Sequence, residues 1–214
     1  MAESFGMTTE TSANKDNLLI GAAERPQLPV TVVSGQDLVV GTVVGRIDKG
    51  AGTIAAVGGN TGNGTMTGTV GLTSLTKPGV YTFKCVTAAT NGGTFSVISP
   101  DGHRLQDAIV GTAYTGAHLT GVTVNDGSTD YAVGDSFTVT IATGSGKWKA
   151  FNAANTDGSE IPRGIIAHDC DASDADTLGS VYLSGEFNSA AVTGATASAK
   201  LKLQEFGIIV RSAN

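Results

Sequence analysis

Apolar and polar side chains alternate along several short stretches in the middle of the chain, which is the pattern of strands with one buried face. Tyr81, Phe83 and Cys85 share one side of such a stretch, while Thr82 and Lys84 share the other. The same period of two recurs at Phe95 and Val97, at Val122 and Val124, and at Phe137, Val139 and Ile141. We therefore expect a β-sandwich whose strands each have one buried face and one solvent-exposed face.

Turn-forming residues lie between these predicted strands. Three segments offer residues that tolerate a positive φ angle: Asn91-Gly92-Gly93, Pro100-Asp101-Gly102 and Asn125-Asp126-Gly127. Glycine-rich stretches at Gly58 to Gly64 and at Thr143 to Gly146 bracket the region and are typical of linkers. The interpretation is an inserted domain over residues 59–144, of the size of an immunoglobulin-like sandwich but without the Cys and Trp hallmarks of antibody domains.

The flanking residues, 18–58 and 145–214, then form one discontinuous core. Apolar runs at Gly164 to Ala167 and at Val181 to Leu183 predict a hairpin whose strands are joined by an Asp/Ser-rich turn. A short segment at Gly185 to Asn188 continues the second run. The expected fold class is mainly β, with a small β-rich core interrupted by the inserted sandwich.

Both ends of the chain carry distinct signals. Ala, Lys, Leu, Gln and Glu predict one short helix over residues 197–206, with Gly207 as its stop and an apolar strand over residues 208–210. Residues 1–17 hold few apolar groups and are expected to form a flexible arm without a core of its own. Three consecutive apolar residues, Leu18-Leu19-Ile20, follow this arm.

The amino-acid composition supports a mainly β fold and argues against some classes of function. The 214 residues include 30 Gly and are 40% hydrophobic, which suits short strands joined by tight turns. A formal charge of −6 and the lack of clustered Lys and Arg argue against nucleic-acid binding. No apolar run is long enough to span a membrane, and the N-terminus lacks a signal-peptide pattern, so we expect synthesis and assembly in the cytoplasm.

Catalytic and metal-binding patterns are weak. His103, His118 and His168 have no second His or Cys at a metal-ligand spacing. Ser99, Asp101 and His103 have triad chemistry, but they lie within one short turn and could not converge on a substrate. We expect no catalytic residue, no metal and no cofactor.

Three further features have alternative interpretations. The acidic loop Asp169, Asp171, Asp174 and Asp176 is either a calcium site or a solvated turn; the EF-hand spacing fails, which favours the turn. Gly144-Ser145-Gly146-Lys147 resembles the end of a P-loop, but Trp148 stands where Ser or Thr is needed. Cys85 and Cys170 are either a bridge between the modules or two buried thiols, and a reducing compartment favours the thiols.

Five blocks, taken in order, resemble the head decoration (capsid cement) proteins of tailed bacteriophages, the lambda decoration protein family. The blocks are Leu28 to Leu38, Gly41 to Ile47, Gly146 to Phe151, Gly164 to Val192 and Gly207 to Arg211. In family members of ordinary length a segment like the second is followed almost at once by one like the third, so the residues between them resemble an insertion into a single loop.

The resemblance implies a structural protein on the exterior of the virion. A homotrimer would bind the outer surface of the expanded head and stabilise the lattice of the major capsid protein, and the arm would contact the capsid by adding a strand to a sheet edge. The candidate capsid contacts are Phe5, Met7, Leu18, Leu19 and Ile20. The candidate core or inter-subunit anchors are Trp148, Phe151, Tyr182 and Phe187.

Two other classes of function stay open at this point. A phage tail or fibre component, or a surface adhesin, is also Gly/Thr-rich and modular, but it would show a repeat array or a secretion signal. A small hydrolase on a β-scaffold would need a nucleophile, a base and oxyanion donors that converge. If the chain is a head decoration protein, a further hypothesis is that the inserted domain contacts host surfaces or glycans.

Overall fold

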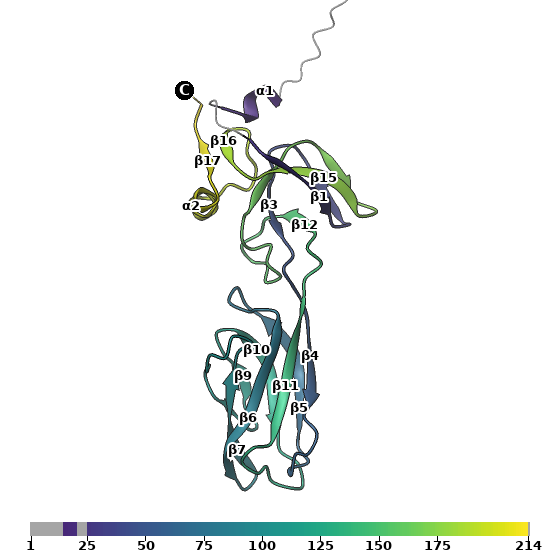
Figure 1. Cartoon of the computed structure of the whole chain (residues 1–214), viewed down its shortest axis with the longest axis vertical. Coiled ribbons are helices and arrows are strands. Elements are labelled where there is room, and N and C mark those ends of the chain that lie inside the picture. The colour runs from purple at the N-terminus through teal and green to yellow at the C-terminus, as the bar shows by residue number, and fades with distance from the viewer. Residues whose placement is uncertain (1–14, 21–24, 214) are drawn as a thin grey trace, which may run out of the picture. The chain divides into compact units, whose positions relative to one another are not determined.

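The computed structural model of the chain describes residues 15–20 and 25–213 and divides into two compact units. The barrel unit comprises Met1–Gly45, Trp148–Phe151 and Ile161–Asn214, and the sheet unit comprises Arg46–Lys147 and Asn152–Glu160 (Figure 1). The sheet unit therefore contains the predicted insert, 59–144, and extends beyond it. The backbone passes between the units four times, after Gly45, Lys147, Phe151 and Glu160.

Five short strands close into a barrel in the barrel unit. Their order around the barrel is β1 (Gln27–Val32), β12 (Trp148–Ala150), β3 (Val43–Arg46), β13 (Gly164–Ile166) and β15 (Thr177–Tyr182). β1 runs parallel to β12, with Val32 opposite Trp148, and antiparallel to β15 along its whole length. Closure leaves no free edge, which explains how strands of three to six residues form a stable sheet.

The barrel interior is filled by β-branched side chains. Val32, Val44, Ile166 and Val181 are completely buried and pack with Trp148. Gly164 stands where a Cβ atom would collide with Cγ1 of Val181, so only glycine fits beside that side chain.

The predicted hairpin is confirmed, but its loop is more ordered than expected. β13 pairs with β15 through Ile165 opposite Tyr182 and Ile166 opposite Val181. The Asp/Ser-rich connection contains a strand of its own, β14 (Cys170–Ala172), which pairs with β2 (Gln36–Leu38). A polar composition concealed this strand because only two of its side chains, Cys170 and Ala172, face the core.

The C-terminal elements agree with the sequence-based prediction. α2 (Ala197–Glu205) begins after Thr196, whose side chain accepts a hydrogen bond from the backbone N–H of Ala199 at 3.2 Å. Gly207 follows with a φ of 76°, and β17 (Ile208–Arg211) comes next. β17 runs parallel to β16 (Gly185–Asn188), and a four-residue helix, α1 (Lys15–Leu18), precedes the strands.

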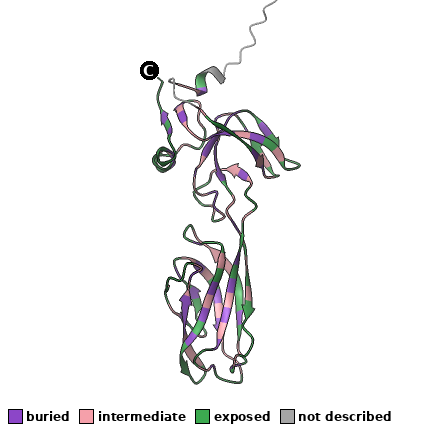
Figure 2. Cartoon of the chain, viewed as in Figure 1, coloured by how far each residue is buried: buried purple, intermediate pink, exposed green. Residues whose placement is uncertain are grey.

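Two antiparallel sheets make up the sheet unit. The five-stranded sheet has the order β4 (Lys49–Ala56), β11 (Ser136–Thr143), β6 (Gly79–Ala89), β7 (Gly92–Ile98) and β8 (Ala108–Ile109). The three-stranded sheet has the order β5 (Thr65–Leu72), β10 (Leu119–Asn125) and β9 (Ala113–Thr115). Both sheets contribute side chains to one hydrophobic core. Figure 2 shows buried positions along the strands of this unit.

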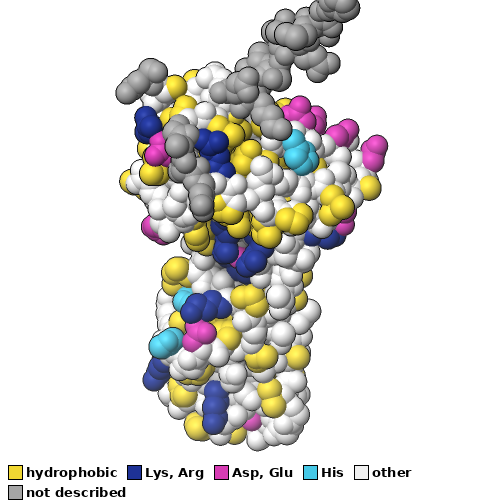
Figure 3. All heavy atoms as spheres, turned by 45° about the horizontal axis from the view of Figure 1, so that its top comes forward, with side chains coloured by type: hydrophobic (Ala, Val, Ile, Leu, Met, Phe, Trp, Pro, Cys, Tyr) yellow, Lys and Arg dark blue, Asp and Glu magenta, His cyan; other side chains and the backbone are white. Residues whose placement is uncertain are grey.

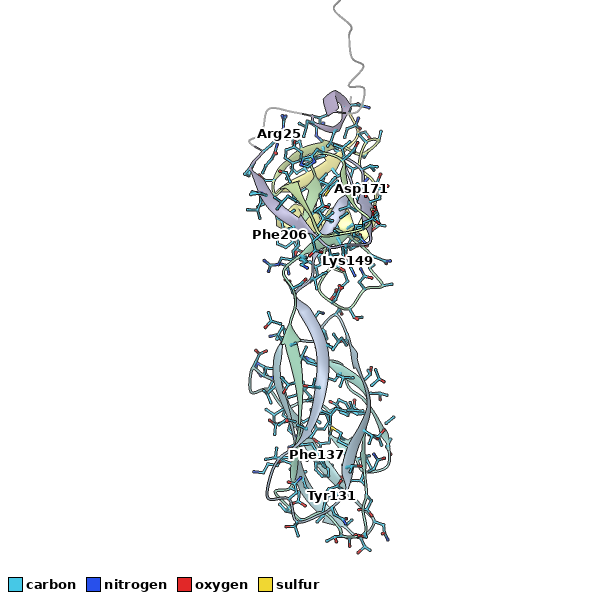
Figure 4. All side chains as sticks on the ribbon, turned by 90° about the vertical axis from the view of Figure 1, so that its right-hand side faces the viewer. Arg25, Tyr131, Phe137, Lys149, Asp171 and Phe206 are labelled. Atoms are coloured by element: carbon cyan, nitrogen blue, oxygen red, sulfur yellow. The ribbon has the colours of Figure 1, made fainter. Side chains whose placement is uncertain are left out.

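The predicted alternation is confirmed in this core. Tyr81, Phe83 and Cys85 are completely buried while Lys84 is exposed. The rings of Phe95, Tyr131 and Phe137 lie 5.0 to 6.0 Å apart, two of the three pairs edge to face; Figure 4 labels Tyr131 and Phe137. The β6–β7 turn places Asn91 at a φ of 51°, as its Asn-Gly-Gly sequence predicts.

The glycine-rich stretch at Gly58 to Gly64 is not a linker between the units. It joins β4 to β5 inside the sheet unit, and a buried carboxylate holds it in place. Asp135 accepts backbone N–H bonds from Thr61 and Gly62, at 2.8 Å each, and from Ala132 at 3.0 Å. Burial alone would raise the pKa of Asp135, but these three donors outweigh it and hold the pKa below its ordinary value.

Candidate functional site

The N-terminal part of the chain is attached to a small sheet in the barrel unit. Leu19 forms an antiparallel bridge with Phe187, and the N–H of Ile20 donates to the carbonyl of Glu186 at 3.0 Å. The side-chain amide of Asn188 donates to Oδ1 of Asn17 at 2.8 Å. Because β16 also pairs with β17, Leu19 and Ile20 add a third, short segment to this sheet, directly after α1, and together with Asn17 and Leu18 they make up residues 17–20. We call these residues the arm root.

A compact apolar cluster supports the arm root. Leu18 is only 2% exposed, and Phe187, Leu203 and Ile208 are completely buried in the same cluster. The rings of Phe187 and Tyr182 lie 5.4 Å apart at an angle of 54°. Backbone pairing and core packing therefore both hold the arm root in the barrel unit.

Polar and apolar side chains share the exposed surface near β17. Arg211 and Glu186 form an ion pair at 2.7 Å on neighbouring strands. Ile209, on the same strand as Arg211, and Phe206, at the end of α2, are each more than two-fifths exposed; Figure 4 labels Phe206. Isolated exposed apolar residues are common, so this pair does not by itself mark a binding surface.

The structure places the predicted capsid contacts in different environments. Phe5 and Met7 lie outside the described residues. Leu18 lies in the core, and Leu19 and Ile20 are half-buried at the arm root. A capsid contact made by the side chain of Leu18 would require it to leave this core.

The candidate anchors all lie in the barrel unit. Trp148 is 6% exposed and packs inside the barrel, while Tyr182 and Phe187 belong to the cluster under the arm root. Phe151 is half-buried against the same cluster. Three of the four are thus buried within one chain, and Phe151 is half-buried; whether any of them also contacts a second copy stays a prediction.

Sequence reasoning missed the large apolar side chain that is most exposed among the described residues of the barrel unit. Leu178 on β15 is 78% exposed, and Leu201 on α2 is 66% exposed. The exposure of Leu178 could have been predicted from the period of two along β15. Leu178 and Ser180 lie on one face of the strand, whereas Gly179 and Val181 face the interior.

The acidic loop is used for backbone hydrogen bonding. Asp169 accepts from the N–H of Val40 at 2.7 Å, and Asp176 accepts from the N–H of Ser34 at 3.0 Å. Asp171 accepts from the side chain and backbone of Ser173, and these bonds lower the pKa of Asp171. Across residues 15–20 and 25–213, no three His, Cys, Asp or Glu side chains are grouped so that they could hold a metal ion.

The triad-like residues and the two cysteines have structural environments. Ser99 is buried, and its hydroxyl oxygen accepts a hydrogen bond from the backbone N–H of His103 at 3.2 Å, which closes a turn. Cys85 and Cys170 are both free and buried, as expected, and burial raises the pKa of each thiol. Within the described part of the chain, no helix has both the length and the apolar character needed to cross a bilayer.

The exposed surface is mixed in character. Figure 3 shows charged side chains of both signs scattered among polar and hydrophobic ones on one face. The ion pairs on this kind of surface, such as Lys77 with Asp101 and Lys202 with Glu205, join exposed groups and contribute little stability.

Comparisons with known proteins give one informative match. Curated proteins include no match to this chain. Two crystal structures of FlgL from Xanthomonas campestris are 19% identical over 51% and 49% of this chain, with TM-scores of 0.34 and 0.33. The chain covers only about a third of the length of FlgL (34% and 33%).

The family model of the bacteriophage lambda head decoration protein D matches residues 7–208. This span includes the arm root, the barrel unit up to the start of β17 and the whole sheet unit. The match extends over nearly the entire chain, and the chain therefore belongs to the lambda head decoration protein D family.

Proposed function

We propose that this protein binds the expanded phage head as a homotrimer and clamps neighbouring major-capsid-protein subunits with the residues that precede the arm root. Membership of the family makes the protein a structural, non-enzymatic component of capsid decoration on the exterior of the virion. The trimer, the capsid subunit contacted and the role of the N-terminal residues are the parts that we propose.

The arm root is the observation that carries this proposal. Pairing of Leu19 with Phe187 and of Ile20 with Glu186 anchors the backbone that residues 1–14 precede. An extended segment that starts from a fixed point can add to an exposed sheet edge of a partner through main-chain hydrogen bonds. Three such segments on one trimer would bind as a multivalent unit, so that weak single contacts dissociate slowly together.

Deletion of residues 1–14 tests the role of this segment. The variant keeps α1 and the arm root, so we expect the fluorescence and thermal unfolding of the barrel unit, followed through Trp148, to stay unchanged. Occupancy of expanded heads, measured by electron microscopy, should be lost. Full occupancy by the truncated protein would refute the role of residues 1–14, and loss of the fold would show that they stabilise the core instead.

For the contact between copies we propose the outward face of β15. Leu178 is 78% exposed there, beside Thr31 of β1. We expect Leu178→Ser to lower the trimer fraction in analytical ultracentrifugation, whereas Leu201→Ser, on α2, should not. The same fraction of trimer in both variants would rule out this face.

We further propose that the sheet unit is an immunoglobulin-like insertion into the decoration-protein core, facing outward on the head. The ends of its main segment are adjacent, because the N–H of Ile47 donates to the carbonyl of Lys147 at 2.8 Å and the N–H of Gly146 donates to the carbonyl of Ile47 at 2.9 Å. A short turn can therefore replace residues 48–146. The aromatic side chains of this unit are buried, so they are not available to stack on sugar rings, and the glycan hypothesis gains no support.

Excision of residues 48–146 tests this assignment. We combine it with Glu160→Gln, because the excision removes the buried partner of that carboxylate, Lys49. The shortened protein should still fold and bind heads, but its barrel unit should unfold at lower denaturant than in the full chain, because residues 152–160 lose Asp48 and Lys49 as partners. A folded protein that no longer binds heads would show that the sheet unit takes part in capsid contact.

A further inference from the structure

Residues 152–160 lie between two barrel strands, β12 and β13, and yet they belong to the sheet unit. A simple insertion would need only two passages of the backbone between the units, and this segment adds two more. We call residues 152–160 the strap.

The chain on either side of the strap is hydrogen-bonded to one barrel strand. The N–H of Phe151 donates to the carbonyl of Val43, and the N–H of Arg163 donates to the carbonyl of Val44, both at 2.9 Å. Val43 and Val44 lie on β3, the strand that leads into the sheet unit. If the strap were released, these two hydrogen bonds to β3 would be weakened, and β3 would become more mobile.

The middle of the strap is bound to the chain that follows β3. The carbonyl of Asp157 accepts hydrogen bonds from the N–H groups of Asp48 and Lys49, at 2.8 Å each. Gly158 has a φ of 109°, and a Cβ atom there would lie 2.7 Å from the carbonyl oxygen of Arg46 and from the nitrogen of Asp48. Only glycine permits this close approach of two backbones.

A buried ion pair closes the strap. Nζ of Lys49 lies 2.7 Å from Oε1 of Glu160, and both side chains are 5% exposed. The ammonium group also donates to the carbonyl of Thr73 at 2.9 Å, and Oε2 of Glu160 accepts from the N–H of Gly158 at 2.6 Å. Separation of the two groups would leave each buried charge without its partner, so opening of the pair costs a large free energy.

We propose that the strap couples the unfolding of the sheet unit to that of the barrel unit, with the Lys49–Glu160 pair as its clasp. Unfolding of the sheet unit removes Asp48, Lys49 and Thr73 from the strap. The freed strap then no longer holds its two ends against β3. Units joined by ordinary linkers open independently, whereas units joined in this way open together.

The two buried thiols report the two units separately. Cys85 is completely buried in the core of the sheet unit, and Cys170 is 3% exposed in the core of the barrel unit. The full chain is incubated with a thiol reagent at increasing denaturant concentration, and peptide mass spectrometry gives the modified fraction of each cysteine. In the natural sequence we expect both thiols to become reactive over the same range of denaturant.

Two variants open the strap by different means. Lys49→Met combined with Glu160→Met removes the clasp without leaving a buried charge, and Gly158→Ala displaces the strap backbone while keeping both charges. In each variant we expect Cys85 to become reactive at lower denaturant than Cys170. Lys77→Met, which breaks an exposed ion pair in the same unit, is the control and should leave the two curves together.

Each other outcome refutes the proposal. Separate labelling curves in the natural sequence would show that the units already open independently. A parallel shift of both curves in the strap variants would show that the strap contributes stability but no coupling.

Discussion

Phe187→Ala gives the sharpest test of how the arm root is held. Phe187 is completely buried, packs on Tyr182 with ring centroids 5.4 Å apart, and pairs through its backbone with Leu19. Loss of a fully buried phenyl ring removes its transfer free energy and leaves a cavity, which together cost about 3–5 kcal/mol. Since the net stability of a domain is about 5–15 kcal/mol, the barrel unit should lose a large share of its stability.

Denaturant unfolding followed by the fluorescence of Trp148, the only tryptophan, measures this loss in the barrel unit. The matched control is Phe206→Ala, because Phe206 is 44% exposed and follows α2 in the same unit. We expect a change below about 1 kcal/mol for the control. Equal effects of the two substitutions would contradict the assignment of Phe187 as the residue that anchors the arm root.

Three further predictions concern other parts of the chain. The folded state lowers the pKa of Asp135 below the ordinary 3.8, so its contribution to stability is complete above that pH and is lost as the pH falls through the folded-state pKa. Between pH 7 and the acid range, the free energy of unfolding of the sheet unit should therefore fall by more in the natural protein than in Asp135→Asn, as denaturant unfolding at each pH would measure. Thr196→Ala should lower the stability of the barrel unit by about 1 kcal/mol in denaturant unfolding, because the N-cap hydrogen bond of α2 is lost. Ser99→Ala and His103→Ala should leave head occupancy unchanged in electron microscopy, and an essential role for either would contradict a structural function.

Local structure could be predicted from the sequence where a single period dominates. The alternation of Phe137, Val139 and Ile141 indicated a strand with one buried face, and the structure confirms it. The helix near the C-terminus and its Gly207 stop followed from helix propensity and from the tolerance of glycine for a positive φ. Such signals are local because they arise from the steric limits of a few consecutive residues.

Glycine-rich composition did not distinguish a linker from a turn. Gly58 to Gly64 has the sequence of a flexible linker, but Asp135, more than seventy residues further along the chain, accepts its N–H groups and fixes it inside the sheet unit. The composition of the stretch predicts its turns, whereas the carboxylate that binds it is known only from the fold.

The sequence by itself therefore determined the β class, the turns, the C-terminal helix and the resemblance to the decoration family, since each depends on short-range patterns. Only the tertiary structure decided which strands pair, that β12 and β14 exist as three-residue strands, and that the strap belongs to the sheet unit. The physical reason is that these features depend on partners distant in sequence. Lys49 and Glu160, separated by 111 residues, carry no local sign that they form a buried pair.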